Sequence, residues 1–278
     1  MANNLLDLSG KTALITGGSS GIGKAIAALF VKWGAQVIII GQNKEKLQQA
    51  QKEISITQCS HFLCDLSKFD QINIAFSQII RKFPTIDILV NCAGIYKENK
   101  STHTIQDNDN ISLNMDTIQE LIKVNLLSYW YLGLKISTLM KKNNYGAIIN
   151  ISSVNGICGK AVCDIYDITK AGINNLTLNQ AMQLAKFNIR VNAICPSSTI
   201  TPMRDKAMAE YPPPISTNGY NQLEASSIPL QRLGNPEDIA SLALLLSSKG
   251  GEYITGQIIS IDGGFLLTRK VPLSFQET

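Results

Sequence analysis

Short apolar runs alternate with amphipathic stretches along the whole chain. The apolar runs cover residues 12–15, 36–40, 61–64, 87–90, 147–151, 189–195 and 257–261. Each run has the length and composition typical of a buried strand. Between them, apolar residues recur three or four positions apart, which predicts helices over about 22–33, 44–54, 75–83, 116–142, 164–186 and 236–246. Apolar strands that alternate with helices predict a parallel sheet covered on both faces.

This order of elements predicts an α/β fold of the Rossmann type. Right-handed connections would wind the chain into a doubly wound parallel sheet of about seven strands, in a three-layer αβα arrangement. We find no internal repeat or linker and treat residues 1–278 as a single domain. Three segments lie outside the pattern: we expect a polar surface loop at 97–114, an irregular lid at about 203–228 and an extended C-terminal tail at 265–278.

The composition argues against several classes of partner. The chain carries 25 Lys and Arg against 21 Asp and Glu, a net charge of +4, which is too small and scattered to indicate nucleic acid or an anionic membrane. The start lacks the pattern of a secretory signal, and no apolar run is long enough to span a bilayer, so we expect a cytoplasmic protein. The six cysteines form no C-x-x-C pair and are expected to be free thiols, and two histidines do not predict a metal site.

A glycine-rich segment joins the first predicted strand to the first predicted helix. Its sequence is Thr16-Gly17-Gly18-Ser19-Ser20-Gly21-Ile22-Gly23. Glycine allows a sharp turn and a close approach of the backbone to a ligand, and the N-terminus of the following helix offers N–H groups to an anion. The spacing differs from G-x-G-x-x-G and from a Walker A motif. The segment predicts a phosphate-binding turn, with a simple tight turn as the alternative.

Polar residues follow several of the predicted strands directly. They are Asp65 after the third strand, 91–94 after the fourth, Ser152 and Ser153 after the fifth, and 196–199 after the sixth. Ligands of open parallel sheets bind at the carboxyl ends of the strands. We therefore expect these residues and the glycine-rich turn to border one site.

Tyr166 and Lys170 lie four residues apart on a predicted helix and therefore share one face. A tyrosine hydroxyl has a pKa near about 10, and a neighbouring ammonium group lowers that pKa because it favours the phenolate. Such a tyrosine can exchange a proton with an alcohol. Ser153 would hydrogen-bond the same substrate oxygen, and Asn125 would hold a water that relays protons to Lys170. The alternative is an exposed tyrosine and an exposed lysine at helical spacing.

The glycine-rich turn and the Tyr166–Lys170 pair are two of ten short motifs that follow one another along the chain. They are Thr16 to Gly23, Asp65-Leu66, Asn91-Cys92-Ala93-Gly94, Val124-Asn125-Leu126, Asn150-Ile151-Ser152-Ser153, Tyr166 to Lys170, Arg190-Val191-Asn192-Ala193, Thr201-Pro202-Met203, Thr255-Gly256-Gln257 and Asp262-Gly263-Gly264. With them the sequence resembles the classical short-chain dehydrogenase/reductase family over nearly its whole length. The resemblance implies an NAD(P)-dependent oxidoreductase that transfers a hydride between nicotinamide C4 and a carbonyl or secondary alcohol carbon.

The resemblance also implies roles for the motif residues. The catalytic set would be Asn125, Ser153, Tyr166 and Lys170, with Tyr166 as general acid/base and Lys170 also on the nicotinamide ribose. The cofactor would contact Gly17, Ser19, Ser20, Gly21, Ile22, Gly23, Gln42, Asn43, Asp65, Leu66, Asn91, Ala93, Gly94, Tyr166, Lys170, Thr199 and Thr201. Asp65 would bind the adenine amino group, and the two threonines the carboxamide region. The resemblance further implies a homotetramer, with the helices that carry Asn125 and Tyr166 at one interface.

Two positions depart from the family pattern. Cys92 replaces the second Asn of Asn-Asn-Ala-Gly, which we expect to be harmless. Ser197 replaces the glycine after the sixth strand, where a side chain would tighten the nicotinamide pocket or stiffen the hinge of the lid.

The choice of nicotinamide depends on Gly41-Gln42-Asn43, after the second predicted strand. No acidic residue stands there to bind the ribose hydroxyls of NAD, and no Arg stands there to pair with the 2′-phosphate of NADP. Since the missing acid removes the repulsion that would exclude the phosphate, the balance favours NADP, with NAD as the alternative.

The sequence allows several classes of small-molecule substrate. The substrate side of the site is expected at Ile95-Tyr96, Val154-Asn155, 158–163 and the lid, where Arg204 and Lys206 are candidate partners of an anionic group. A 3-oxoacyl carrier-protein reductase, a sugar or polyol dehydrogenase and a secondary-metabolism ketoreductase all fit this mixed lining. The alternative to an enzyme is a catalytically silent dinucleotide-binding regulator of the same fold, although a regulator has no need of an intact proton-transfer set.

Overall fold

The computed structural model describes residues 4–97, 114–159, 165–210 and 216–268. Its centre is one parallel sheet with the strand order β3-β2-β1-β4-β5-β6-β7. The strands are β1 (Thr12–Thr16), β2 (Gln36–Gly41), β3 (Cys59–Leu63), β4 (Ile88–Asn91), β5 (Gly146–Ile151), β6 (Ile189–Pro196) and β7 (Ile258–Ile261). The predicted Rossmann-type sheet is confirmed, because β1 lies between β2 and β4 and the winding reverses there.

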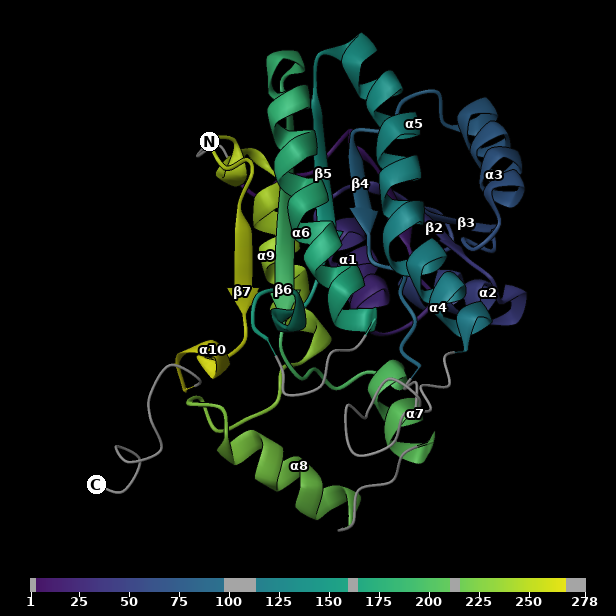
Figure 1. The fold of residues 1–278 in the computed structure, drawn as a ribbon. Coiled ribbons are helices and arrows are strands. Elements are labelled where there is room, and N and C mark those ends of the chain that lie inside the picture. Colours follow the sequence, from purple (N-terminus) through teal and green to yellow (C-terminus); the bar gives the residue numbers. More distant parts are fainter. Residues whose placement is uncertain (1–3, 98–113, 160–164, 211–215, 269–278) are drawn as a thin grey trace.

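Helices cover both faces of the sheet (Figure 1). The helices are α1 (Gly21–Lys32), α2 (Lys44–Ile54), α3 (Phe69–Lys82), α4 (Met115–Ile122), α5 (Ser128–Asn143), α6 (Ile165–Leu184), α7 (Pro202–Glu210), α8 (Thr217–Ser226), α9 (Pro236–Ser247) and α10 (Phe265–Thr268). One apolar core joins α1, α2 and α9 to the sheet, and a second joins α3, α5 and α6 to the opposite face. The alternating strand side chains therefore fill two separate cores, as a doubly wound sheet requires.

The helix predicted over 116–142 is wrong in one respect. A π-helical turn at Lys123–Leu127 separates α4 from α5. Such a turn inserts a residue into the helical hydrogen-bond ladder and often marks a functional site. Asn125 lies in this turn and is fully buried.

The prediction of an irregular lid at 203–228 is also wrong. The chain forms α7 and α8 there, and both lie beyond the carboxyl ends of the strands (Figure 1). Neither helix has a fully buried residue, so neither has the apolar stripe by which a helix is recognised in a sequence. The predicted loop 97–114, apart from its two end residues, lies outside the described residues, as does the predicted tail 265–278 after Thr268.

Within the ranges that the structure describes, no helix combines the length and apolar character needed to cross a bilayer. The same ranges contain no cluster of three or more His, Cys, Asp or Glu side chains placed to bind a metal. The five cysteines described there are all free thiols.

Candidate active site

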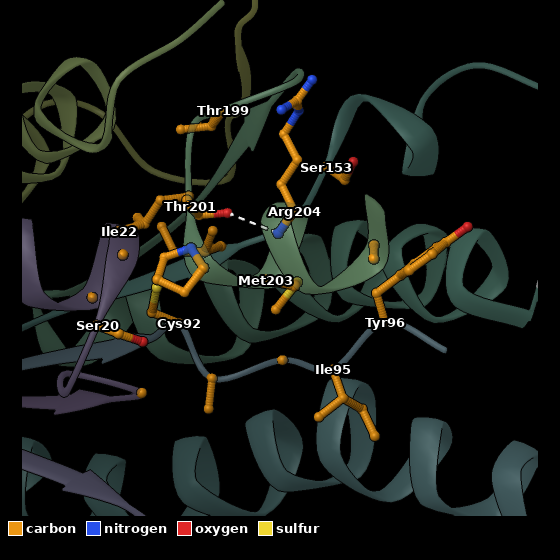
Figure 2. Close-up of a pocket in the computed structure, with 18 of the residues that line it drawn as sticks. Ser20, Ile22, Cys92, Ile95, Tyr96, Ser153, Thr199, Thr201, Met203 and Arg204 are labelled. Carbon is orange, nitrogen blue, oxygen red and sulfur yellow. Dashed lines mark hydrogen bonds between the residues drawn. The ribbon is translucent and has the colours of Figure 1, made fainter. Parts of the chain in front are cut away.

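A cleft of about 940 Å³ opens at the carboxyl ends of the strands. Its walls come from the glycine-rich turn, the segments after β2, β4, β5 and β6, the start of α6, and the two lid helices. Figure 2 shows Ser20 and Ile22 on one side of this cleft and Ser153, Tyr96 and Arg204 on the other. The segments predicted to border one site therefore meet.

Two glycines of the glycine-rich turn, Gly17 and Gly23, have no room for a side chain. Gly17 has φ +68, and a Cβ added there would lie 2.9 Å from the Cα of Ala93. A Cβ at Gly23 would lie 2.5 Å from the carbonyl oxygen of Gly17. Helix α1 begins directly after this turn, with no acidic residue in its first turn and no side-chain capping bond from Ser20. These features fit a dinucleotide pyrophosphate, since backbone N–H groups and the helix dipole attract an anion.

The end of the cleft beside β2 and β3 combines Asp65 with the segment after β2. The Oδ1 atom of Asp65 accepts hydrogen bonds from the backbone N–H (3.0 Å) and hydroxyl (2.7 Å) of Ser67. Burial raises the pKa of Asp65, but the Ser67 bonds and the nearby Lys68 outweigh it and lower the pKa overall. Gln42, Asn43 and Lys46 line the same end. The Asn43 side chain caps α2 by accepting from Lys46 N at 2.8 Å.

Of the predicted cofactor set, Asn91 and Lys170 do not line the cleft. Asn91 is fully buried, and its Nδ2 donates to Asn150 Oδ1 at 2.9 Å, so it joins β4 to β5 inside the sheet. The other predicted cofactor residues all lie on the wall of the cleft.

Ser153, Tyr166 and Lys170 come together at the ends of β5 and α6. Ser153 follows β5, and its hydroxyl accepts from Asn155 N at 3.1 Å. Tyr166, in the first turn of α6, lines the cleft. One turn later, Lys170 is 4% exposed; its Nζ donates to the carbonyl oxygen of Ile151 (2.9 Å) and lies 5.5 Å from the centre of the Tyr166 ring. This arrangement excludes the interpretation of Lys170 as an exposed lysine.

Burial lowers the pKa of the Lys170 ammonium group. Removal from water lowers the pKa of its ammonium group to about 8, although the thiols of Cys92 and Cys195 oppose the shift. Lys170 is therefore a cation at neutral pH that can lose its proton under mildly basic conditions. Burial also raises the pKa of Cys92, to about 12, so this thiol stays neutral beside the cleft.

Asn125 holds the segment after β4. Its Oδ1 accepts from Ile95 N at 2.8 Å, and its Nδ2 donates to Ile95 O at 2.9 Å. The side chain thus binds the Ile95 backbone from within the π-helical turn. The water relay from Asn125 to Lys170 stays a prediction.

Sequence reasoning missed three contacts at this site. The Thr16 hydroxyl oxygen accepts from the backbone N–H groups of Cys92 (2.8 Å) and Ala93 (2.9 Å). The Tyr129 hydroxyl lies 3.0 Å from Ala93 O and 3.2 Å from Ile151 O. The Tyr96 ring meets the Tyr166 ring edge-on, with centroids 5.3 Å apart. The sequence had indicated Thr16 as part of the glycine-rich motif and Tyr96 on the substrate side, but not these contacts, and Tyr129 was in no motif.

Helices α7 and α8 carry two of the charged groups that line the cleft, Arg204 and Glu224. Arg204 Nη2 donates to Glu224 Oε2 and to Asn221 Oδ1, both at 2.6 Å, and the Ser198 hydroxyl donates to the other oxygen of Glu224. The backbone N–H of Arg204 donates to the Thr201 hydroxyl (Figure 2). Lys206 pairs with Glu210 at 3.5 Å and does not line the cleft. Arg204 and Lys206 thus each pair with a glutamate, so neither is an unpaired cation for an anionic substrate group.

Comparisons with known proteins agree with this geometry. A family model described as enoyl-(acyl carrier protein) reductase, which belongs to the short-chain dehydrogenase/reductases, matches residues 17–266. The chain belongs to the short-chain dehydrogenase/reductase family. It is an NAD(P)-dependent oxidoreductase. The 3-oxoacyl-(acyl-carrier-protein) reductase FabG of Thermotoga maritima is 35% identical over 262 residues, 94% of this chain and 99% of that protein.

Two solved structures of the family are also similar. A putative gluconate dehydrogenase from Agrobacterium tumefaciens has a TM-score of 0.83 at 30% identity, covering 94% of this chain and 98% of that one. A putative NAD(P)-dependent gluconate 5-dehydrogenase from Beutenbergia cavernae, with bound NADP at low occupancy, has a TM-score of 0.81 at 26% identity, covering 95% and 99%. The family is therefore clear, while the names of these relatives point to different substrates.

Proposed function

We propose that this protein reduces the ketone of a neutral, largely apolar substrate, with a 3-oxoacyl thioester as the best example. The observation that carries the proposal is that Tyr166 and Ser153 line the same cleft, with the Nζ of the buried Lys170 5.5 Å from the centre of the Tyr166 ring. Bound NADPH would supply the hydride. Ser153 would donate a hydrogen bond to the carbonyl oxygen, and Tyr166 would give that oxygen its proton as the hydride arrives.

The other two members of the set act through position and charge. The Lys170 cation lies beside the Tyr166 ring and favours the phenolate that remains after proton transfer. Its place next to the Ile151 carbonyl also suits a contact with the nicotinamide ribose. Asn125 keeps the Ile95 backbone in place and so supports the segment whose next residue, Tyr96, packs against Tyr166.

The substrate end of the cleft supports an apolar substrate over a sugar acid. Apolar and aromatic side chains dominate its lining: Ile95, Tyr96, Val154, Met203, Ala207, Met208, Tyr220 and Phe265. The charged groups among the described lining residues of this end are paired, Arg204 with Glu224 and Glu120 with Lys97. A substrate carboxylate or phosphate would have to break such a pair, which costs free energy.

NADP is the proposed cofactor. Gln42, Asn43 and Lys46 line the end of the cleft after β2, and no acidic side chain stands among them. Lys46 is the candidate partner of the 2′-phosphate, because it lines the cleft at this end. A cation near that phosphate and the absence of a carboxylate both favour NADP over NAD.

A cytoplasmic homotetramer is the proposed state of the protein. Large apolar side chains are exposed on α5 and α6: Trp130, Leu134, Ile168, Leu178 and Met182. Exposed apolar groups on two neighbouring helices suit a packed interface between subunits. Molecular mass in solution tests this proposal.

The activity is tested by following the absorbance of NADPH with a panel of substrates. The panel holds a 3-oxoacyl thioester, a simple apolar ketone, an enoyl thioester and, in the oxidative direction, a sugar acid such as gluconate. We expect the highest kcat/KM with the oxoacyl thioester and loss of that activity in Tyr166→Phe. Preferred turnover of the sugar acid or the enoyl group would contradict the substrate proposal. If wild type and Tyr166→Phe show equal, negligible rates on every substrate, the protein would instead be a catalytically silent dinucleotide-binding regulator.

A further inference from the structure

The turn that follows Ser153 rests directly on α6. This turn, a 3-10 helix at Val154–Gly156, passes so close to the helix that a Cβ on Gly156 would lie 2.6 Å from the carbonyl carbon of Lys170. The turn also holds Ser153, since Gly156 N donates to Ser153 O at 3.0 Å and Asn155 N donates to the Ser153 hydroxyl at 3.1 Å. The orientation of the Ser153 hydroxyl therefore depends on where this turn sits.

Asn174 fastens the turn to the helix. It lies one helical turn after Lys170 and is 7% exposed. Its Nδ2 donates to Gly156 O at 3.0 Å, and its Oδ1 accepts from the Cys195 thiol of β6 at 3.6 Å. Its amide is thus oriented by β6 while it holds the turn.

A second bond ties the neighbouring residue to the same helix. The Ser152 hydroxyl donates to Lys170 O at 3.0 Å. Ser152 thus fixes the end of β5 against α6, and Asn174 fixes the turn that begins after Ser153. Small displacements of a reacting group reduce rates strongly, so a site of this kind needs such support.

We propose that Asn174 is a positioning residue that acts through Ser153. By holding the carbonyl of Gly156, it keeps the turn against α6 and keeps the Ser153 hydroxyl in register with Tyr166 on the same helix. The inference rests on the proposed role of Ser153 in ketone reduction. It involves no contact of Asn174 with substrate or cofactor.

The test is a double-mutant cycle on kcat. Asn174→Leu removes the donor at similar volume, and we expect kcat to fall about tenfold with the Kd for NADPH unchanged. Ser153→Ala should lower kcat by about a hundredfold. In the Ser153→Ala background, Asn174→Leu should change kcat by less than about twofold, because its target is already lost. Asn174→Ser, which is small and polar, serves the same cycle where the leucine variant does not fold.

Two control variants separate positioning from general damage. Thr177→Val removes a buried hydroxyl one turn further along α6, where it accepts from Asn150 and not from the Ser153 turn. It should lower Tm while kcat stays near that of wild type. Cys195→Ala removes the thiol that donates to Asn174 Oδ1 and also contacts Ser152 and the Ser153 backbone, but it leaves the Asn174 donor on Gly156 O in place. It should therefore change kcat less than Asn174→Leu does.

Three results would overturn the proposal. A tenfold loss from Asn174→Leu in both backgrounds would make Asn174 a merely structural residue. If kcat is unchanged in Asn174→Leu while Ser153→Ala is slow, Asn174 has no positioning role. The proposed function, including the role of Ser153, would then be unaffected. A Ser153→Ala variant as fast as wild type would instead refute the role of Ser153, and the inference with it.

Discussion

The cofactor side and the lid side of the cleft are built in different ways. Backbone at strand ends forms the first: Gly17 and Gly23 have no space for a side chain, and Thr16 ties the end of β1 to the segment after β4. Side chains on α7 and α8 form the second, where Arg204 and Glu224 hold two surface helices together. A site built from backbone tolerates few changes, while one built from side chains can be altered without losing the fold.

The largest effect is expected on the cofactor side. Gly23→Ala places a methyl group 2.5 Å from the Gly17 carbonyl oxygen, so the turn has to move. We expect NADPH affinity to fall about a hundredfold while the fold persists. Fluorescence titration with NADPH measures this, and Gly159→Ala, where an added Cβ meets nothing within 4 Å, is the control. Wild-type affinity in Gly23→Ala would remove the argument for a backbone-built pyrophosphate site.

The second prediction concerns pH and the buried Lys170. Because its pKa is about 8, the cation is present below pH 8 and is lost as the pH rises through that value. The kcat/KM for ketone reduction should therefore fall above about pH 8, approaching tenfold per pH unit. Lys170→Met should be slow and lack this break. A wild-type profile that stays flat to pH 10 would contradict the assignment.

The third prediction concerns the lid. Arg204→Ala removes the cation that pairs with Glu224 and frees α7 from α8, so we expect KM for the ketone to rise about tenfold with little change in NADPH affinity. The exchange Arg204→Glu with Glu224→Arg should recover part of the loss. If Arg204→Ala instead weakened the binding of NADPH and of the ketone equally, the two sides of the cleft would not act independently.

The smallest effect is expected where the two sides meet. The Ser197 hydroxyl donates to Asp262 O at 3.3 Å and so links the segment after β6 to the end of β7. Ser197→Gly removes this bond and adds backbone freedom, which should change kcat or the Kd for NADPH about threefold. Steady-state kinetics measures kcat, and a binding titration measures the Kd for NADPH. If neither value changes, Ser197 has no role at this site.

The same contrast explains how much the sequence predicted. The strands were recognisable because runs such as Val37–Ile40 are buried on both faces and therefore continuously apolar. The proposed catalytic pair was recognisable because Tyr166 and Lys170 share one helix face. Both depend on local spacing, which a sequence shows directly.

What was missed depends on contacts between distant segments. Helices α7 and α8 have no buried stripe, so their periodicity is weak, and the pairing of Arg204 with Glu224 exists only once the lid is folded. The π-helical turn at Lys123–Leu127 adds a single residue to the helix, and so local a shift is not recognisable in the sequence pattern. The amide of Asn174 reaches Gly156 across 18 positions, and no pattern of apolar residues marks such a bond.

The central claim is that Tyr166 gives a proton to the substrate oxygen during hydride transfer. It is tested most directly by single-turnover oxidation of bound NADPH with a saturating 3-oxoacyl thioester, in wild type and in Tyr166→Phe. We predict that hydride transfer is about a thousandfold slower in Tyr166→Phe while the Kd for NADPH stays within about twofold of wild type. Equal rates of NADPH oxidation in the two proteins would contradict the claim.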